Sequence, residues 1–167
     1  MSVETNSGSP TPHQDVNDLL IDWVKGVRKI LSENMIGLYL FGSLTYGDFV
    51  RGRSDIDLQA VVREPLGSDE LSSIEKFHLE LERRHAAWAG RVECSYVPAV
   101  LLSEILPPTT PRPWWGFSAL YRAAPYGNEW IINQYLLDEY GIALVGPDFG
   151  TLLERPVDVM QVRKASA

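Results

Sequence analysis

The chain has 167 residues, is 45% hydrophobic and carries a formal net charge of −7. Its length suits one domain, or one domain with an appendage, and its hydrophobic content is enough to bury a core, which excludes a disordered chain. The negative charge argues against a protein that binds nucleic acid through its overall charge, so no nucleic-acid partner is expected.

The cysteine content and the N-terminal sequence bear on the cellular compartment. Cys94 is the only cysteine, so an internal disulfide is excluded, and this fits a reducing environment. The first fifteen residues lack the basic and apolar segments of a signal peptide, and the longest apolar runs are far short of a membrane span. We therefore expect a cytoplasmic protein with no membrane partner.

The first part of the chain alternates helical and strand patterns. Residues 1–13 are predicted to be flexible, because most of them are small, polar or proline. The elements expected after them, in chain order, are an amphipathic helix to about residue 31, a strand at 35–41, a glycine-rich loop at 42–54, a strand at 55–63, a helix at 69–88 and a strand at 91–98.

The second part is less regular. It is expected to contain an extended linker at 107–113, an ambiguous aromatic segment, a helix at 128–140 closed by Gly141, and a short strand at 142–146. The order of elements predicts an α/β (α+β) fold, a small mixed β-sheet flanked by helices. Strands 35–41 and 55–63 should pair antiparallel, because the loop between them is too short for a helical crossover. The expected domain organisation is one α/β domain at 14–106, followed by a linker and C-terminal appendage at 107–167.

Three carboxylates are predicted to meet on one face of this sheet. Side chains alternate along a strand, so Asp55 and Asp57 share a face, and Glu93 joins them if its strand is the neighbour. Like charges repel, and burying them unpaired is costly, so such a cluster makes sense when a divalent cation neutralises it. A small set of oxygen ligands suits Mg²⁺, which completes its coordination with water and phosphate oxygens. Asp55, Asp57 and Glu93 are thus the candidate metal ligands.

The loop before Asp55 is predicted to bind phosphates. Gly42 lets a ligand approach the backbone closely, and Ser43 offers a hydroxyl and a backbone N–H. Arg51 and Arg53 could add positive charge towards a triphosphate, or could simply be solvated loop charges. Gly42, Ser43, Arg53 and Ser54 are the candidate nucleotide-binding residues.

The stretch "FGSLTYGDFVRGRSDIDL" resembles the nucleotidyltransferase superfamily of the DNA polymerase β type, whose signature is an apolar strand, Gly-Ser and a following Asp-x-Asp. Within it, the chain is most similar to aminoglycoside adenylyltransferases of the streptomycin/spectinomycin type. "RVECSYVP" resembles the strand of that family with the third carboxylate, and "NEWIINQYLLDEYGIALVGPD" its lead into the C-terminal region.

The resemblance implies a nucleotidyltransferase fold and Mg²⁺-dependent transfer of a nucleotide, with ATP as the expected donor. Asp55 and Asp57 would hold Mg²⁺ on the triphosphate, with two ions expected in all, and Glu93 would bind the second ion or act as general base. The expected acceptor is the hydroxyl of a small molecule, such as an aminoglycoside.

Two other interpretations stay open. The chain could be an antitoxin-like protein that binds or adenylylates a partner protein, or a catalytically impaired nucleotide-binding remnant. Members of the family run about a hundred residues further into a helical domain. The resemblance therefore implies a nucleotidyltransferase domain at 14–106 and, within 107–167, the start of a truncated helical domain; alternatively, the acceptor site could be completed by another chain, for example in a homo-oligomer. Trp114 and Trp115 could stack on a substrate ring, but packing within the protein is the commoner role for such residues.

Overall fold

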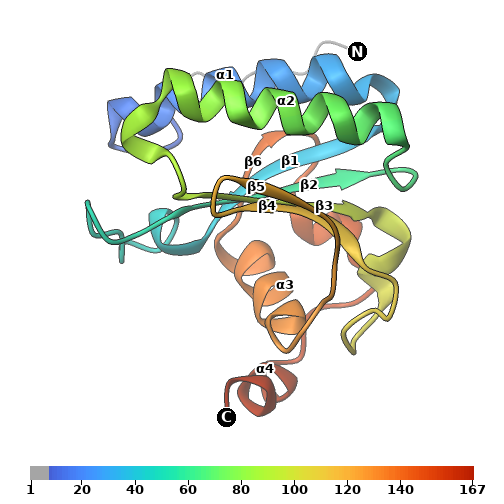
Figure 1. Ribbon diagram of the computed structural model, residues 1–167. Helices are drawn as coiled ribbons and strands as arrows, with labels where there is room; N and C mark the ends of the chain where they lie inside the picture. Colours follow the sequence, from blue (N-terminus) through green and yellow to red (C-terminus); the bar gives the residue numbers. More distant parts are fainter. Residues whose placement is uncertain (1–7) are drawn as a thin grey trace.

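Six strands form one mixed sheet in the computed structural model, which describes residues 8–167 (Figure 1). Residues 1–7, which belong to the predicted flexible N-terminus, lie outside the described residues. The strands are β1 (Met35–Phe41), β2 (Ile56–Val62), β3 (Val92–Pro98), β4 (Arg112–Gly116), β5 (Ala119–Ala124) and β6 (Ile142–Val145). The helices are α1 (Gln14–Leu31), α2 (Ser68–Arg84), α3 (Glu129–Tyr140) and α4 (Val159–Ser166).

The strand order is β5-β4-β3-β2-β1-β6, and only the β2–β3 pair is parallel. The predicted antiparallel pairing of the first two strands is confirmed. The parallel pair arises because α2 lies between β2 and β3 in the chain and supplies the crossover that parallel strands need. The predicted mixed α+β architecture is therefore the observed one.

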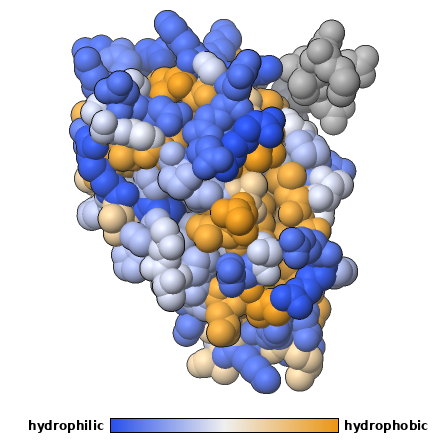
Figure 2. Space-filling view, turned by 90° about the vertical axis from the view of Figure 1, so that its right-hand side faces the viewer, coloured by the Kyte–Doolittle hydropathy of each residue, from blue (hydrophilic) through white to orange (hydrophobic). Residues whose placement is uncertain are grey.

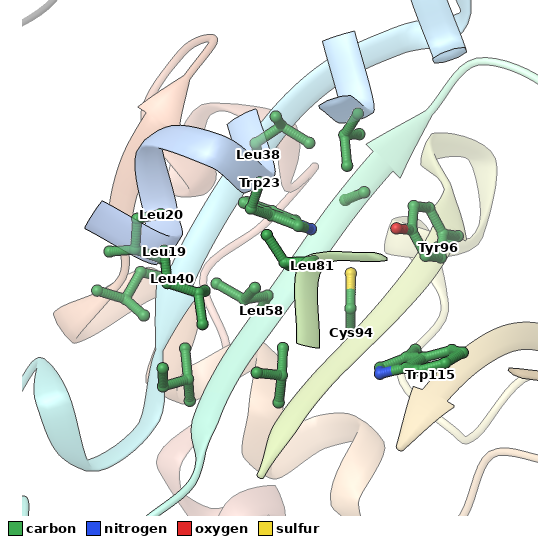
Figure 3. Packing of buried hydrophobic residues seen from close by; sticks show 14 of the residues in the cluster. Leu19, Leu20, Trp23, Leu38, Leu40, Leu58, Leu81, Cys94, Tyr96 and Trp115 are labelled. Atoms are coloured by element: carbon green, nitrogen blue, oxygen red, sulfur yellow. The ribbon is translucent and has the colours of Figure 1, made fainter. Parts of the chain in front are cut away.

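Helices cover the sheet on both sides. Helices α1 and α2 lie side by side on one face, and α3 packs on the other, with α4 beyond it (Figure 1). The larger core fills the space between the sheet and α1 and α2, and Figure 3 shows side chains from both layers interdigitating there. Among them, Trp23, Leu58 and Cys94 are almost completely buried. Alternation along β2 and β3 leaves the opposite face of these strands free for polar residues.

Residues after 106 belong to the same sheet. Strands β4 and β5 form a hairpin on β3, and β6 pairs with the far edge of β1. The boundary expected at residue 106 therefore does not coincide with an edge of the sheet. The segment that the sequence left ambiguous is this hairpin, and Trp115 enters the core, in line with the packing role predicted for it.

Some apolar side chains remain in contact with solvent. Figure 2 shows hydrophobic surface in the middle and lower part of one face, between hydrophilic side chains. The exposed large apolar residues include Val100 and Leu106, which follow β3, and Phe117 at the tip of the β4–β5 hairpin. Among residues 8–167, no helix is both long and apolar enough to cross a membrane.

Candidate active site

Asp57 and Glu93 lie opposite each other on neighbouring strands. The parallel register of β2 and β3 pairs Asp57 with Glu93 directly, on the face opposite α1 and α2. The condition set by the sequence, that the strand of Glu93 must neighbour that of Asp57, is therefore met. Strand spacing of about 4.8 Å brings the two carboxyl groups within reach of each other.

Proximity and burial favour the protonated form of the Asp57–Glu93 pair. Burial, the adjacent charge of Glu93, a hydrogen bond to Glu93 and the charge of Asp55 together raise the pKa of Asp57 to about 8. Burial also raises the pKa of Glu93, and the nearby charge of Asp55 adds to this, although the hydrogen bond from Asp57 works in the opposite direction. The pair therefore holds less negative charge at neutral pH than two ordinary carboxylates would.

Asp55 stands at the mouth of the site. Its side chain is about 42% exposed, and its Oδ1 lies 3.8 Å from Nε of Arg91, two residues before Glu93. The Arg91 guanidinium also donates to the Ser54 carbonyl and lies over the Trp88 ring at 4.6 Å. Arg91 thus joins the start of β3 to the loop before β2. This role could not be predicted from its position near Glu93 in the sequence.

The donor set has the chemistry that Mg²⁺ prefers, since it consists of carboxylate oxygens. Within the described part of the chain, however, no three His, Cys, Asp or Glu side chains already form a group that could hold a metal ion. Asp55 faces Arg91, while Asp57 and Glu93 face each other. Among residues 8–167, no basic side chain lies within ion-pair distance of Asp57 or Glu93, so a bound cation would supply positive charge that this acidic pair lacks.

Gly42 closes one side of the site. It follows β1 directly, has a positive φ of 78°, and begins a short 3₁₀ turn that ends at Leu44. A Cβ at Gly42 would lie 2.2 Å from Oδ2 of Asp57, so only glycine leaves room for that carboxyl group. The backbone of the Gly-Ser pair therefore lies close to the acidic pair. A ligand bound between the two would be in close contact with both.

We expect Gly42→Ala to weaken nucleotide binding, in addition to the loss of stability caused by placing alanine in a left-handed conformation. A left-handed alanine costs roughly 1–2 kcal/mol, and its Cβ would also displace the Asp57 carboxyl group. Gly47→Ala is the matched control, since Gly47 has a φ of 79° in the same loop but open space around it. Chemical denaturation and ATP titration should show similar backbone costs for both variants and loss of nucleotide binding only for Gly42→Ala. Equal nucleotide affinity in the two variants would contradict this role of Gly42.

The other predicted nucleotide-binding residues have different surroundings. Ser43 is half-buried in the turn, and its carbonyl accepts a hydrogen bond from the Asp48 N–H at 3.1 Å. The Ser54 hydroxyl accepts a hydrogen bond from the Val50 N–H at 2.9 Å, and this contact joins the two ends of a short turn in the loop. The hydroxyl proton can still be donated to a ligand. Arg53 is exposed and forms no ion pair with residues 8–167.

Arg51 does not point at the candidate site. Its two guanidinium nitrogens contact both carboxylate oxygens of Asp15 at 2.8 and 2.9 Å, which ties the loop to the first turn of α1. The Arg51 hydrogen bond also holds the pKa of Asp15 well below its usual range. The structure shows neither of the two outcomes considered for Arg51, because its ion pair with Asp15 makes it an organising residue of the loop.

Comparisons with known proteins agree with this geometry. Residues 24–105 match the sequence model of the nucleotidyltransferase domain family, a span that contains Gly42, Ser43, Asp55, Asp57 and Glu93. No curated protein sequence matches the chain at a significant level. Among solved structures, spectinomycin adenyltransferase AAD(9) from Enterococcus faecialis, determined with ATP and spectinomycin, superposes with a TM-score of 0.65 at 23% identity.

That superposition covers 89% of this chain and 63% of the adenyltransferase, so the chain spans less than two thirds of its length. Two further structures superpose more weakly. A tri-AMPylated Shewanella oneidensis HEPN toxin in complex with MNT antitoxin gives a TM-score of 0.39 at 12% identity, over 89% of this chain and 83% of the other. A toxin–antitoxin with AMP-PNP gives 0.38 at 16%, over 85% and 82%. The nucleotidyltransferase fold thus follows from the family match and the first superposition.

Proposed function

Because the chain carries a nucleotidyltransferase domain over residues 24–105, we propose that it transfers AMP from ATP to a hydroxyl group of a small acceptor. The observation that supports this best is the pairing of Asp57 with Glu93 directly beneath Gly42. A triphosphate lying against the Gly42–Ser43 turn would place its phosphorus atoms beside this acidic pair, which is the arrangement that in-line nucleotidyl transfer needs.

Asp55, Asp57 and Glu93 are the residues that would hold Mg²⁺. When bound, the cation supplies positive charge that offsets the triphosphate and the carboxylates together. Asp57 would have to be ionised to hold the cation, because carboxylates bind metal in their ionised form, and its raised pKa opposes this at neutral pH. Ser43 and Ser54 would donate hydrogen bonds to phosphate oxygens, and Arg53 would add charge from the loop.

Glu93 is the candidate general base. The acceptor hydroxyl gives its proton to the Glu93 carboxylate, and its oxygen attacks the α-phosphorus. A new oxygen–phosphorus bond forms while the bond from the α-phosphorus to the bridging β-phosphate oxygen breaks, and pyrophosphate leaves with the electron pair. The products are an adenylylated acceptor and pyrophosphate. The role of the protein is to align the hydroxyl and keep the base at hydrogen-bond distance.

We expect ATP with Mg²⁺ to raise the melting temperature of the protein, because the pair binds the native state alone. Mg²⁺ alone or ATP alone should have a smaller effect, since each leaves part of the charge uncompensated. The test is differential scanning fluorimetry, followed by incubation with ATP labelled at the α-phosphate and a panel of hydroxylated acceptors that includes spectinomycin. Absence of both a melting-temperature rise and labelled product would overturn the proposed function.

A further inference from the structure

A hollow lies between the β4–β5 hairpin and the start of α3. It has a volume of about 510 Å³, within the range of small-molecule sites, and is open to solvent on one side. The residues that border it are Arg112, Trp114, Tyr121, Arg122, Ala123, Ala124, Pro125 and Glu129. Trp114 and Tyr121 therefore give the hollow an aromatic wall, and Arg112, Arg122 and Glu129 add charged groups to its lining.

The hollow opens on the same sheet face as Glu93. Strands β3 and β4 are antiparallel with Ser95 opposite Trp114, and the same register places Gly116 opposite Glu93. The Trp114 indole leans over Gly116 so closely that a Cβ there would lie 2.2 Å from the ring. The indole therefore lies over the strand position opposite Glu93.

Arg112 lies at the inner end of the hollow and is 8% exposed. Its Nη1 donates to the carbonyls of Ala124 and Pro125, its Nε lies 3.4 Å from the Ser95 hydroxyl, and its guanidinium stacks on Tyr126 at 4.4 Å. No carboxylate of the described residues lies within ion-pair distance of it. Burial lowers the pKa of Arg112, yet an arginine keeps its charge in a protein.

Glu129, at the edge of the hollow, forms no ion pair with Arg112, although its charge is near enough to raise the pKa of that group. A nearly buried cation whose charge is only partly offset gains from a ligand that supplies an anionic group. The Nη2 group of Arg112 makes no hydrogen bond to residues 8–167, so two N–H donors remain for an oxygen acceptor in the hollow. A guanidinium binds phosphate or carboxylate oxygens more strongly than neutral ones.

The hairpin that carries this wall is held rigidly. The buried Glu82 carboxylate accepts hydrogen bonds from Trp115 Nε1 at 3.1 Å and from the Ser118 hydroxyl at 2.7 Å. The turn residues Phe117 and Ser118 both have positive φ, 51° and 59°, although neither is glycine. Left-handed backbone at non-glycine residues costs energy and persists where the surroundings enforce it, as Glu82 does here.

We propose that this hollow binds the acceptor, and that the acceptor is a hydroxylated ring carrying an anionic group, a phosphate or a carboxylate. The ring stacks on Trp114 and Tyr121, the anionic group pairs with Arg112, and a ring hydroxyl faces Glu93. The assignment rests on the proposed nucleotidyl transfer. It also distinguishes this chain from an enzyme for polycationic acceptors, because an ammonium group in the hollow would face Arg112 with like charge.

Binding of the acceptor probes is measured without ATP. A protein that fails to transfer AMP can therefore still show whether the hollow binds the probes. The probes are glucose 6-phosphate, glucuronate, glucose and spectinomycin, and the readout is the indole N–H signals of the five tryptophans in ¹H–¹⁵N spectra. Trp114→Phe and Trp115→Phe identify the two adjacent signals. We expect the Trp114 signal to shift with glucose 6-phosphate or glucuronate, and less with glucose or spectinomycin. The Trp115 signal is an internal control, because that indole bonds to Glu82 on the opposite face.

Arg112→Met should weaken binding of the anionic probes by about ten- to hundredfold, the usual loss for a hydrogen bond to a charged group. Arg83→Met is the matched control, because Arg83 pairs with Glu80 on α2 and does not border the hollow, and it should bind as the parent does. Trp114→Leu tests the site independently if Arg112→Met does not fold. Tighter binding of spectinomycin than of glucose 6-phosphate, no Trp114 shift with any probe, or unchanged affinity in Trp114→Leu would each overturn the proposal.

Discussion

Asp57→Asn is expected to abolish AMP transfer and the melting-temperature rise caused by Mg²⁺ and ATP. Asp57 is the central carboxyl group of the candidate site, opposite Glu93 and in contact with the space that Gly42 leaves open. An amide is a poor ligand for Mg²⁺ and cannot offset its charge. Differential scanning fluorimetry and the labelled-ATP assay give both readouts on one sample. An unchanged ligand-induced rise would remove Asp57 from the metal site.

The same substitution should stabilise the protein without ligands at alkaline pH. The pKa of Asp57 is about 8 in the folded protein, above its unfolded value of about 3.8. The native state therefore holds a proton that the unfolded state releases, so stability falls as pH rises from about 4 to about 8. Asparagine cannot ionise, and Asp57→Asn should gain on the order of a few kcal/mol at pH 8 and almost nothing at pH 4.

Urea unfolding of both proteins at several pH values measures this difference. Asp69→Asn is a suitable control, since it removes an exposed carboxylate from the first turn of α2, far from the acidic pair. It should change stability little and leave the pH dependence as in the parent. A pH dependence that is the same in Asp57→Asn and the parent would contradict the raised pKa of Asp57.

Glu93→Gln is expected to lower the rate of AMP transfer by about 10²–10⁴-fold, the usual contribution of a general base. If Glu93 acts only as a base, the affinity for ATP with Mg²⁺ should stay close to that of the parent. If it holds a metal ion, that affinity should fall as well. Single-turnover assays and calorimetric titration separate the two roles.

The control for Glu93 is Glu75→Gln, which changes a half-buried glutamate of α2, the helix on the opposite face of the sheet. It should leave both transfer and nucleotide affinity unchanged. Equal transfer rates in Glu93→Gln and the parent would exclude Glu93 from the site. A pH profile of the residual activity adds a further readout, because loss of the base removes the acidic limb of the rate profile.

The sequence predicted the first three strands well because their apolar runs are bounded by clear loop signals. Strand 35–41 has the predicted bounds, and strands 55–63 and 91–98 differ by one residue at their ends. Alternation within those strands also placed Asp57 and Glu93 on one face. The helix expected to reach residue 88 ends at Arg84, and its last turn is replaced by a 3₁₀ turn.

The β4–β5 hairpin could not be recognised from its residues. Its turn is Phe117-Ser118, where a two-residue hairpin with left-handed backbone normally calls for Asn or Gly. The turn is enforced by Glu82, which lies more than thirty residues earlier. Arg51 and Arg112 were unpredictable for the same reason, since Asp15 and Ser95 are distant in sequence. Local patterns carry no information about such partners.

The pairing of β6 with β1 has a consequence for synthesis of the protein. Strand β1, which leads into Gly42, leaves the ribosome early, but Val145, the partner of Leu38, follows about 100 residues later. At a usual elongation rate of about 5–20 residues per second, that interval is roughly 5–20 s. During it, one edge of β1 has unpaired N–H and C=O groups, which can pair with another nascent chain. A slow stretch of translation between residues 62 and 142 should therefore increase aggregation of newly made protein.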